Sequence, residues 1–142
     1  MTNQHAYFQV SLKALIIKDK RVLTLISPDK KFDFPGGRIS EEEVELDFRL
    51  TLEREIKEEL SDNFKFEIGQ PIFFSKRKYF KNSNQYNVIA IFFTTAATNS
   101  EISLSDEHES YRWMSFNELL KSAENFVSED EYNKLKDYLT FL

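Results

Sequence analysis

The adjacent glycines Gly36 and Gly37, and an acidic run eighteen residues beyond them, constrain this chain most. The chain holds only three glycines, and these two follow Pro35 directly, where the backbone can take angles closed to other residues. The run Glu55–Glu59 carries glutamates at i, i+3 and i+4, so on a helix their side chains share one face. The sequence therefore predicts a tight turn and three converging carboxylates.

A bound cation would explain the acidic run. Three like charges so close together repel one another, and a divalent cation between them removes that repulsion. Ligands that are all oxygen favour magnesium, manganese or calcium over zinc. Glu55, Glu58 and Glu59 are therefore candidate metal ligands, and the glycine turn beside them suits a phosphate. The alternative is a solvated acidic helix face that binds nothing.

The segments Gly37–Glu43 and Arg54–Leu60 resemble the Nudix box, the metal-binding motif of the Nudix hydrolases. That pattern is a glycine, five residues, a glutamate, seven residues, and then Arg-Glu-aliphatic-x-Glu-Glu-x-Gly. Its right half matches from Arg54 through Glu59, and Phe34-Pro35-Gly36-Gly37 matches the entry that members commonly show.

The first departure from the motif is an insertion of three residues, because ten residues separate Glu43 from Arg54 where the family has seven. Inside a helix these would rotate everything beyond them by roughly 300°. We therefore expect the loop before the helix, or an added turn at its start, to absorb them. The first box glutamate stays open among Glu41, Glu42 and Glu43, and Glu43 is our choice because it needs the smallest insertion.

The second departure is Ser61, where the family has glycine after the helix. Asn63 could take the left-handed conformation instead. The helix has its own apolar pattern, which comprises Leu46, Leu50, Leu52, Ile56 and Leu60. Phe48 falls among the acids, which indicates distortion around residues 44–50. Ser40 and Glu43 also match a capping box. The alternative to a role in the motif is therefore a helix that begins at Glu41.

Composition favours one soluble globular domain over residues 1–142. Hydrophobic residues make up 41% of the chain, yet no apolar run approaches the roughly 18 to 20 residues that span a bilayer. The absence of cysteine removes disulfides, thiolate catalysis and zinc-thiolate sites. A net charge of −5 argues against a nucleic-acid polymer as partner. Without a visible secretory signal, we expect a cytoplasmic protein.

The order of apolar segments predicts a mixed α/β fold. Strands are expected over residues 7–17, 21–27, 64–68, 71–80 and 86–95, and helices after the capping boxes at Ser115 and Ser128. The run Val88–Phe93 is apolar on both faces, as expected of a strand covered by helices on either side. This order is similar to the Nudix fold, an α/β/α sandwich with a mixed sheet between helical layers.

The resemblance implies a magnesium-dependent hydrolase, with manganese as a substitute ion. It would cleave a diphosphate linkage in a nucleoside diphosphate joined to another group, such as a nucleoside triphosphate, a nucleotide sugar or a dinucleotide. Glu55, Glu58 and Glu59 would hold the ion with the backbone carbonyl of Gly36. Arg54, paired with Glu43, would brace the loop. A homodimer stays open.

A further carboxylate outside the box often serves this family as ligand or base. Glu107 is the first candidate and Glu109 the second, and the alternative is a solvated acidic loop. His108 between them has a near-neutral pKa suited to a base, although a single loop histidine is more often incidental.

Substrate-binding candidates are basic and aromatic. On a strand, Lys76 and Lys78 would face a ligand phosphate while Arg77 faces away. The alternative is a solvent-exposed edge strand that these lysines protect from pairing with another chain. Arg38 beside the glycine turn is a further cationic candidate. Four aromatic residues could stack on a base, and these are Phe32, Phe34, Tyr79 and Tyr86. Phe34 is the first candidate among them. The alternative for each is packing in the core.

Three rival functions remain. A catalytically silent Nudix-like sensor would bind a nucleotide without cleaving it, and the intact glutamates count against it. An isoprenoid diphosphate isomerase on the same fold resembles a cysteine-dependent chemistry, which a chain without cysteine disfavours. A calcium-binding or purely structural acidic helix leaves the glycine turn unexplained.

Overall fold

A computed structural model describes residues 4–106, 108 and 110–142. The elements in chain order are β1 (Phe8–Lys18), β2 (Arg21–Ile26), β3 (Phe32–Asp33), β4 (Gly36–Arg38), the 3₁₀ turn η1 (Glu41–Glu43), α1 (Phe48–Leu60), β5 (Phe66–Lys81), β6 (Asn84–Ala97), β7 (Ser110–Ser115), α2 (Phe116–Leu120), the 3₁₀ turn η2 (Ala123–Asn125) and α3 (Glu129–Thr140). Over these residues the strands form one seven-stranded mixed sheet in the order β3-β2-β1-β6-β5, with β4 on β1 and β7 on β2.

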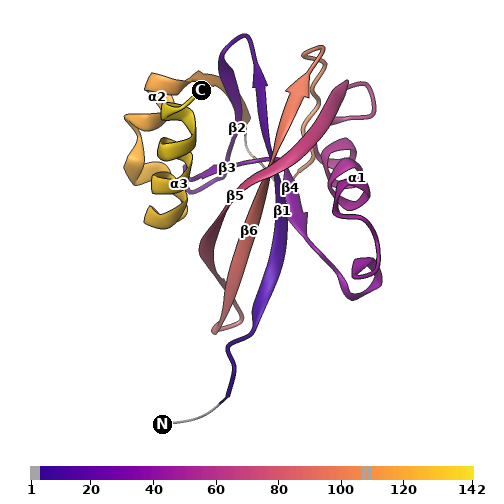
Figure 1. Cartoon of the computed structure of the whole chain (residues 1–142), viewed down its shortest axis with the longest axis vertical. Coiled ribbons are helices and arrows are strands. Elements are labelled where there is room, and N and C mark those ends of the chain that lie inside the picture. The colour runs from indigo at the N-terminus through magenta and orange to yellow at the C-terminus, as the bar shows by residue number, and fades with distance from the viewer. Residues whose placement is uncertain (1–3, 107, 109) are drawn as a thin grey trace.

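Helices cover the sheet on both faces, so the expected sandwich of layers is confirmed. Figure 1 shows α1 on one side of the twisted sheet and α2 with α3 on the other. Two apolar clusters fill the spaces between, and β6 serves both, with Phe92 packed toward α3 and Phe93 toward α1. No helix within the described residues is long and apolar enough to cross a membrane.

The strands differ from the prediction in three respects. Residues 66–68 and 71–80 of the two expected segments belong to the single strand β5, whose ladder to β6 is irregular between Ile68 and Phe73. The expected strands did not include β7. The short strands β3 and β4 carry too few residues to show a period of two, and the sequence did not reveal them. Ser115 and Ser128 cap α2 and α3 as predicted, each accepting a backbone N–H from three residues on.

The segment before α1 absorbs the three-residue insertion. The capping box of Ser40 and Glu43 is present but opens only the 3₁₀ turn η1. The chain then leaves helical geometry, and α1 begins afresh with Asp47 as its N-cap, whose carboxylate accepts the N–H of Arg49 at 2.8 Å. The expected distortion around Phe48 is confirmed, and so α1 keeps an unbroken register through the acidic run.

The apolar face of α1 is narrower than predicted. Leu52, Ile56 and Leu60 are fully buried against the sheet. Leu46 and Leu50, which the helical wheel assigned to the same face, are 48% and 60% exposed. That assignment was wrong. Leu46 precedes the helix, and Leu50 lies in its first turn with its side chain exposed.

We expect Ser61→Gly to stabilise the fold. Ser61 ends α1 with φ 141° and ψ 160°, a region that only glycine adopts without strain, and the strain amounts to about 1–3 kcal/mol. The expectation that Asn63 would take the unusual conformation was therefore wrong, since the strain falls on Ser61 itself. Glycine loses the 2.9 Å bond from Ser61 Oγ to the Glu101 carbonyl, so the net gain should be roughly 1 kcal/mol.

Urea unfolding measures this gain, with Asn63→Gly as the matched control. Asn63 is not among the described non-glycine residues with positive φ, so glycine there should only add unfolded-state entropy and lower the stability. Equal effects of the two substitutions would show that no strain resides at Ser61.

Candidate functional site

The turn at Gly36 is held against β1 so closely that only glycine fits. Gly36 has φ +140°, and a Cβ there would lie 1.9 Å from the carbonyl oxygen of Leu12. The β1–β4 ladder pairs Gly36 with Lys13, and the Pro35 carbonyl accepts the Ala14 N–H at 2.8 Å. The turn is therefore rigid, and it presents the backbone of Gly36 toward α1.

Gly37 leaves room for a carboxylate of α1. A Cβ on Gly37 would lie 2.8 Å from the Glu55 carboxyl group. The α1 helix also approaches from the other end of the turn, where the Gly36 N–H donates to Glu59 Oε1 at 2.9 Å. The two adjacent glycines therefore seat two carboxylates from consecutive turns of one helix.

We expect Gly37→Ala to preserve the fold and impair the site. Its backbone φ is not in the left-handed region, and the group it would strike is the end of a flexible side chain, so the stability should change by less than about 1 kcal/mol. In the metal-dependent hydrolase that the motif implies, displacing the Glu55 carboxylate should lower turnover by roughly 10²-fold, the effect of a misplacement near 1 Å. Thermal unfolding and steady-state kinetics check this pair of outcomes. A variant with full activity would show that Glu55 needs no room at Gly37.

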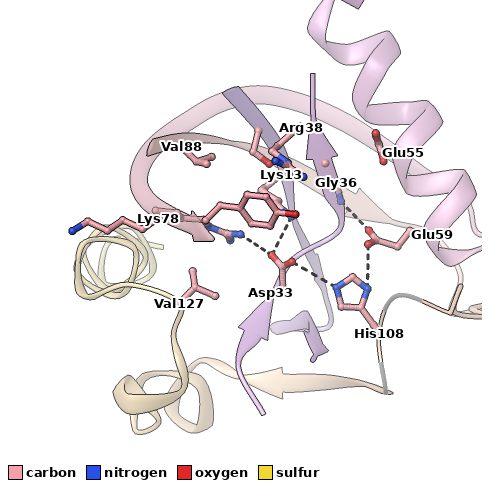
Figure 2. Close-up of a pocket in the computed structure, with 14 residues that line it drawn as sticks. Lys13, Asp33, Gly36, Arg38, Glu55, Glu59, Lys78, Val88, His108 and Val127 are labelled. Atoms are coloured by element: carbon pink, nitrogen blue, oxygen red, sulfur yellow. Dashed lines mark hydrogen bonds and ion pairs between the residues drawn. The ribbon is translucent and has the colours of Figure 1, made fainter. Parts of the chain in front are cut away.

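A cavity of about 720 Å³ opens between the turn, the sheet and the loop before β7. Figure 2 shows Glu55 and Glu59 of α1 at one end and Asp33 and His108 beneath. Cationic, aromatic and apolar side chains from β4, β5, β6 and the segment before α3 form another part of the lining. They are Arg38, Arg77, Lys78, Tyr79, Val88 and Val127. The cavity thus has a carboxylate end and a wall that carries cations and an aromatic ring.

The two carboxylates that α1 places in the cavity are costly to keep charged. Burial raises the pKa of Glu59 to about 7, against the lowering effects of Lys13 and the Gly36 N–H. Burial likewise raises the pKa of Glu55, although neighbouring Arg54 opposes it. Burial thus favours the neutral form of both groups, and an adjacent cation would favour the charged form.

Glu58 does not join them. Its side chain is 61% exposed, and both of its oxygens accept from Arg54 Nη1 at 3.0 Å. Arg54 also contacts Glu43 and lies 3.2 Å from Glu55. The hydrogen bond to Glu43, followed by that to Glu58, raises the pKa of Arg54, while the N–H of Ser40 and then Arg54 lower the pKa of Glu43. The predicted convergence of three carboxylates was wrong for Glu58, because the nearby guanidinium holds it outside the cavity.

Among the described residues, no three acidic or histidine side chains gather closely enough to hold a metal ion. The donor set nevertheless suits a hard cation: Glu55 and Glu59 line one cavity, Glu58 is one turn away on the surface, and every donor is oxygen. Glu55 and Glu58 both contact Arg54, and Glu59 accepts the Gly36 N–H.

Asp33 lies at the base of the cavity and connects three strands. Its Oδ1 lies 3.1 Å from Lys13 Nζ of β1 and 3.0 Å from Arg77 Nη1 of β5, and it accepts the N–H of Phe34 at 2.7 Å. Burial alone would raise the pKa of Asp33, but Lys13 and Arg77 outweigh it and hold that pKa well below its usual range. Asp33 is therefore a charged and tightly held carboxylate.

Arg77 faces the cavity, so the prediction that it faces away from a ligand was wrong. Its side chain is 12% exposed, and its guanidinium binds Glu131 of α3 through Nε at 2.6 Å and Nη2 at 2.8 Å. Lys76 does not line the cavity, and Figure 2 shows Lys78 pointing outward from the cavity's edge. The alternation on β5 was right, but the buried Glu131 decides which face turns inward.

The aromatic candidates divide between the core and the cavity. Phe34 is fully buried against Phe92 and Phe126, so its assignment to substrate binding was wrong. Phe32 likewise packs on Phe126. Tyr79 lines the cavity, and the guanidinium of Arg38 lies 4.0 Å from the centre of its ring.

Sequence reasoning missed Lys13 and Asp33 and undervalued His108. A lysine inside the apolar run of β1 and an aspartate between two phenylalanines were the available signals, since buried charges need partners. Glu107 and Glu109, the candidates for the further carboxylate, lie outside the described residues.

The glycine turn, the carboxylates of α1 and the cavity between them make this a Nudix-type hydrolase fold. The chain belongs to the Nudix family, since the family model of the NUDIX domain matches residues 8–135. No curated protein sequence matches it.

Solved structures show the same fold at low identity. The MutT protein of Methanosarcina mazei Go1 is 22% identical over 96% of each chain, with a TM-score of 0.76. An ADP-ribose pyrophosphatase of Streptococcus suis 89-1591 is 15% identical over 94% of this chain and 90% of its own, with a TM-score of 0.66. A C. elegans Ap4A hydrolase is 18% identical over 94% of this chain and 96% of its own, with a TM-score of 0.65. At these identities the likeness concerns the fold alone.

Proposed function

We propose that this protein is a magnesium-dependent hydrolase that cleaves a diphosphate linkage in a nucleoside diphosphate joined to another group. The observation that carries the proposal is the pair Glu55 and Glu59, a half-buried and a buried carboxylate seated on Gly37 and Gly36 in one cavity. A diphosphate and two carboxylates repel each other, so the pair suits such a substrate only with a cation between them.

The candidate metal ligands are Glu55, Glu58, Glu59 and the Gly36 carbonyl, an oxygen set that magnesium or manganese prefers. When bound, such an ion neutralises phosphoryl oxygens, lowers the pKa of its water and orients the leaving group. Groups of the chain itself hold these ligands in place. The Gly36 N–H donates to one oxygen of Glu59, and Arg54 connects Glu43, which precedes the helix, to Glu55 on it.

The opposite wall would receive the rest of the substrate. Arg38 offers a cation to phosphate oxygens and is already stacked on Tyr79, whereas Lys78 points outward from the cavity's edge. Tyr79, Val88 and Val127 supply the flat and apolar surfaces on which a base can lie. This division of the cavity supports a nucleotide whose diphosphate points toward α1 and whose base points toward β5.

The test is magnesium-dependent hydrolysis of nucleoside triphosphates, nucleotide sugars, dinucleoside polyphosphates and dinucleotide cofactors, comparing wild type with Glu58→Gln and Glu59→Gln. The similar structures include an ADP-ribose pyrophosphatase and an Ap4A hydrolase, which motivate the nucleotide sugars and the dinucleoside polyphosphates in this panel. Metal-dependent turnover that falls by orders of magnitude in both variants would establish the enzyme. Tight nucleotide binding without turnover, and variants that behave as wild type, would favour a silent sensor instead.

A further inference from the structure

His108 lies between two carboxylates of the cavity, those of Glu59 and Asp33. Its Nδ1 is 3.2 Å from Glu59 Oε2, and its Nε2 is 3.6 Å from Asp33 Oδ2 (Figure 2). The imidazole is 9% exposed, so water does not compete freely for either nitrogen. A single ring therefore connects the loop before β7 to both α1 and β3.

The Asp33 end of this connection is fixed. Lys13 and Arg77 hold the carboxylate from two strands, and each is itself tied down, Lys13 by the Phe34 carbonyl at 3.2 Å and Arg77 by Glu131. An anchor with that many partners cannot follow the imidazole. The imidazole must instead follow Asp33.

The Glu59 end is where a carboxylate needs orienting. The Gly36 N–H binds Oε1, which leaves Oε2 free to rotate unless a second group faces it. His108 Nδ1 is that group, and it is one of two buried side-chain polar atoms of the described chain that lack an aligned hydrogen bond. Contacts of this kind are often loose in a free enzyme and tighten when the site is filled.

We propose that His108 is a positioning residue that orients the carboxylate of Glu59 for a divalent cation, with Asp33 fixing the imidazole in turn. The proposal rests on the proposed function only in taking Glu59 as a metal ligand. It gives the histidine a role in metal binding rather than in proton transfer. Groups that orient metal ligands in this way typically contribute about 10- to 100-fold to metal affinity.

Manganese binding in the absence of substrate tests this directly. The probe is Mn²⁺ alone, titrated into the full chain and followed by electron paramagnetic resonance, with thermal unfolding measured in parallel. His108→Ala should weaken Mn²⁺ binding by about 10- to 100-fold. His5→Ala is the matched control, because His5 is exposed near the N-terminus and should bind as wild type.

Two conservative variants separate orientation from packing. Asparagine places its amide near the position of Nδ1, which faces Glu59, whereas glutamine reaches toward the position of Nε2, which faces Asp33. We expect His108→Asn to retain more Mn²⁺ affinity than His108→Gln. A purely structural role would lower the unfolding temperature in both variants without this difference in affinity.

Asp33→Asn tests the role of Asp33 in fixing the imidazole. The neutral amide would hold the imidazole less firmly, so this variant should also bind Mn²⁺ more weakly than wild type. Unchanged Mn²⁺ affinity in folded His108→Ala overturns the proposal. If His108→Ala fails to fold, equal affinities of the asparagine and glutamine variants overturn it instead. A protein that hydrolyses nothing but loses Mn²⁺ affinity in these variants would defeat the proposed function and leave the positioning role standing.

Discussion

Glu59→Gln should make the metal-free protein more stable than wild type at pH 8. Glutamine is neutral, and its amide oxygen can still accept the Gly36 N–H that Glu59 Oε1 accepts. Burial holds the pKa of Glu59 at about 7 in the folded chain, against an ordinary value of 4.5. Charging this carboxylate at pH 8 therefore works against folding, by an amount on the order of 3 kcal/mol.

The gain should disappear in acid. Because the folded pKa of Glu59 is raised, the folded chain binds the proton more tightly, so wild-type stability falls as pH rises from about 4.5 through 7. Below pH 4.5 the side chain is protonated in both states, and wild type and variant should unfold alike. Urea unfolding at pH 4.5 and pH 8 in the presence of a chelator measures this.

Magnesium should reverse the order of stability. On the proposed function, saturating Mg²⁺ should stabilise the wild-type folded state by mass action, and Glu59→Gln should gain much less. Glu58→Gln is the matched control in chelator, because Glu58 is 61% exposed and its pair with Arg54 contributes only about 0.3–0.5 kcal/mol. A Glu59→Gln variant less stable than wild type at pH 8 would contradict the assignment of an uncompensated charge to this position.

Local signals in the sequence predicted the parts of the site that depend on local geometry. Adjacent glycines after a proline, a capping serine and glutamates at i, i+3 and i+4 each act within a few residues, so their consequences could be read from the chain. The loop before α1 took up the insertion for a similar reason, since a helix whose register had slipped would have turned Glu55 and Glu59 away from the glycines.

Parts that depend on distant partners escaped prediction. A strand's period of two shows that Lys78 and Arg77 face opposite ways, but only Glu131, more than fifty residues on, shows which face is inside. Phe34 follows the same rule, since its phenylalanine partners come from β6 and the segment before α3. Glu58 is an exception, because its partner Arg54 is local, four residues back on the same helix.

Arg77→Met should be the most destabilising substitution among the polar residues of the cavity. It removes the partner of Glu131, whose side chain is fully buried, and one of the two cations beside Asp33. Burial lowers the pKa of Arg77, yet Glu131 and Asp33 raise it beyond its ordinary value, so the charged pair is the stable state. Breaking a buried pair from one side costs about 3–5 kcal/mol, because the remaining charge stays desolvated.

That loss is large against the roughly 5–15 kcal/mol by which ordinary domains are folded, so urea unfolding at pH 7 should show it clearly. Arg112→Met is the control: its partner Glu118 lies 3.0 Å away but both side chains are about half exposed, and the loss should stay below about 1 kcal/mol.

Removing Glu131 as well should recover part of the loss. The double variant Arg77→Met with Glu131→Gln leaves no buried unpaired carboxylate at that position, and Ser75 Oγ can still donate to the amide oxygen. We expect the double variant to lose less stability than the sum of the two single variants. Additive losses, or a loss at Arg77 no larger than at Arg112, would show that the pair contributes no more than a surface contact, and the anchor that holds Asp33 would then have to be Lys13 alone.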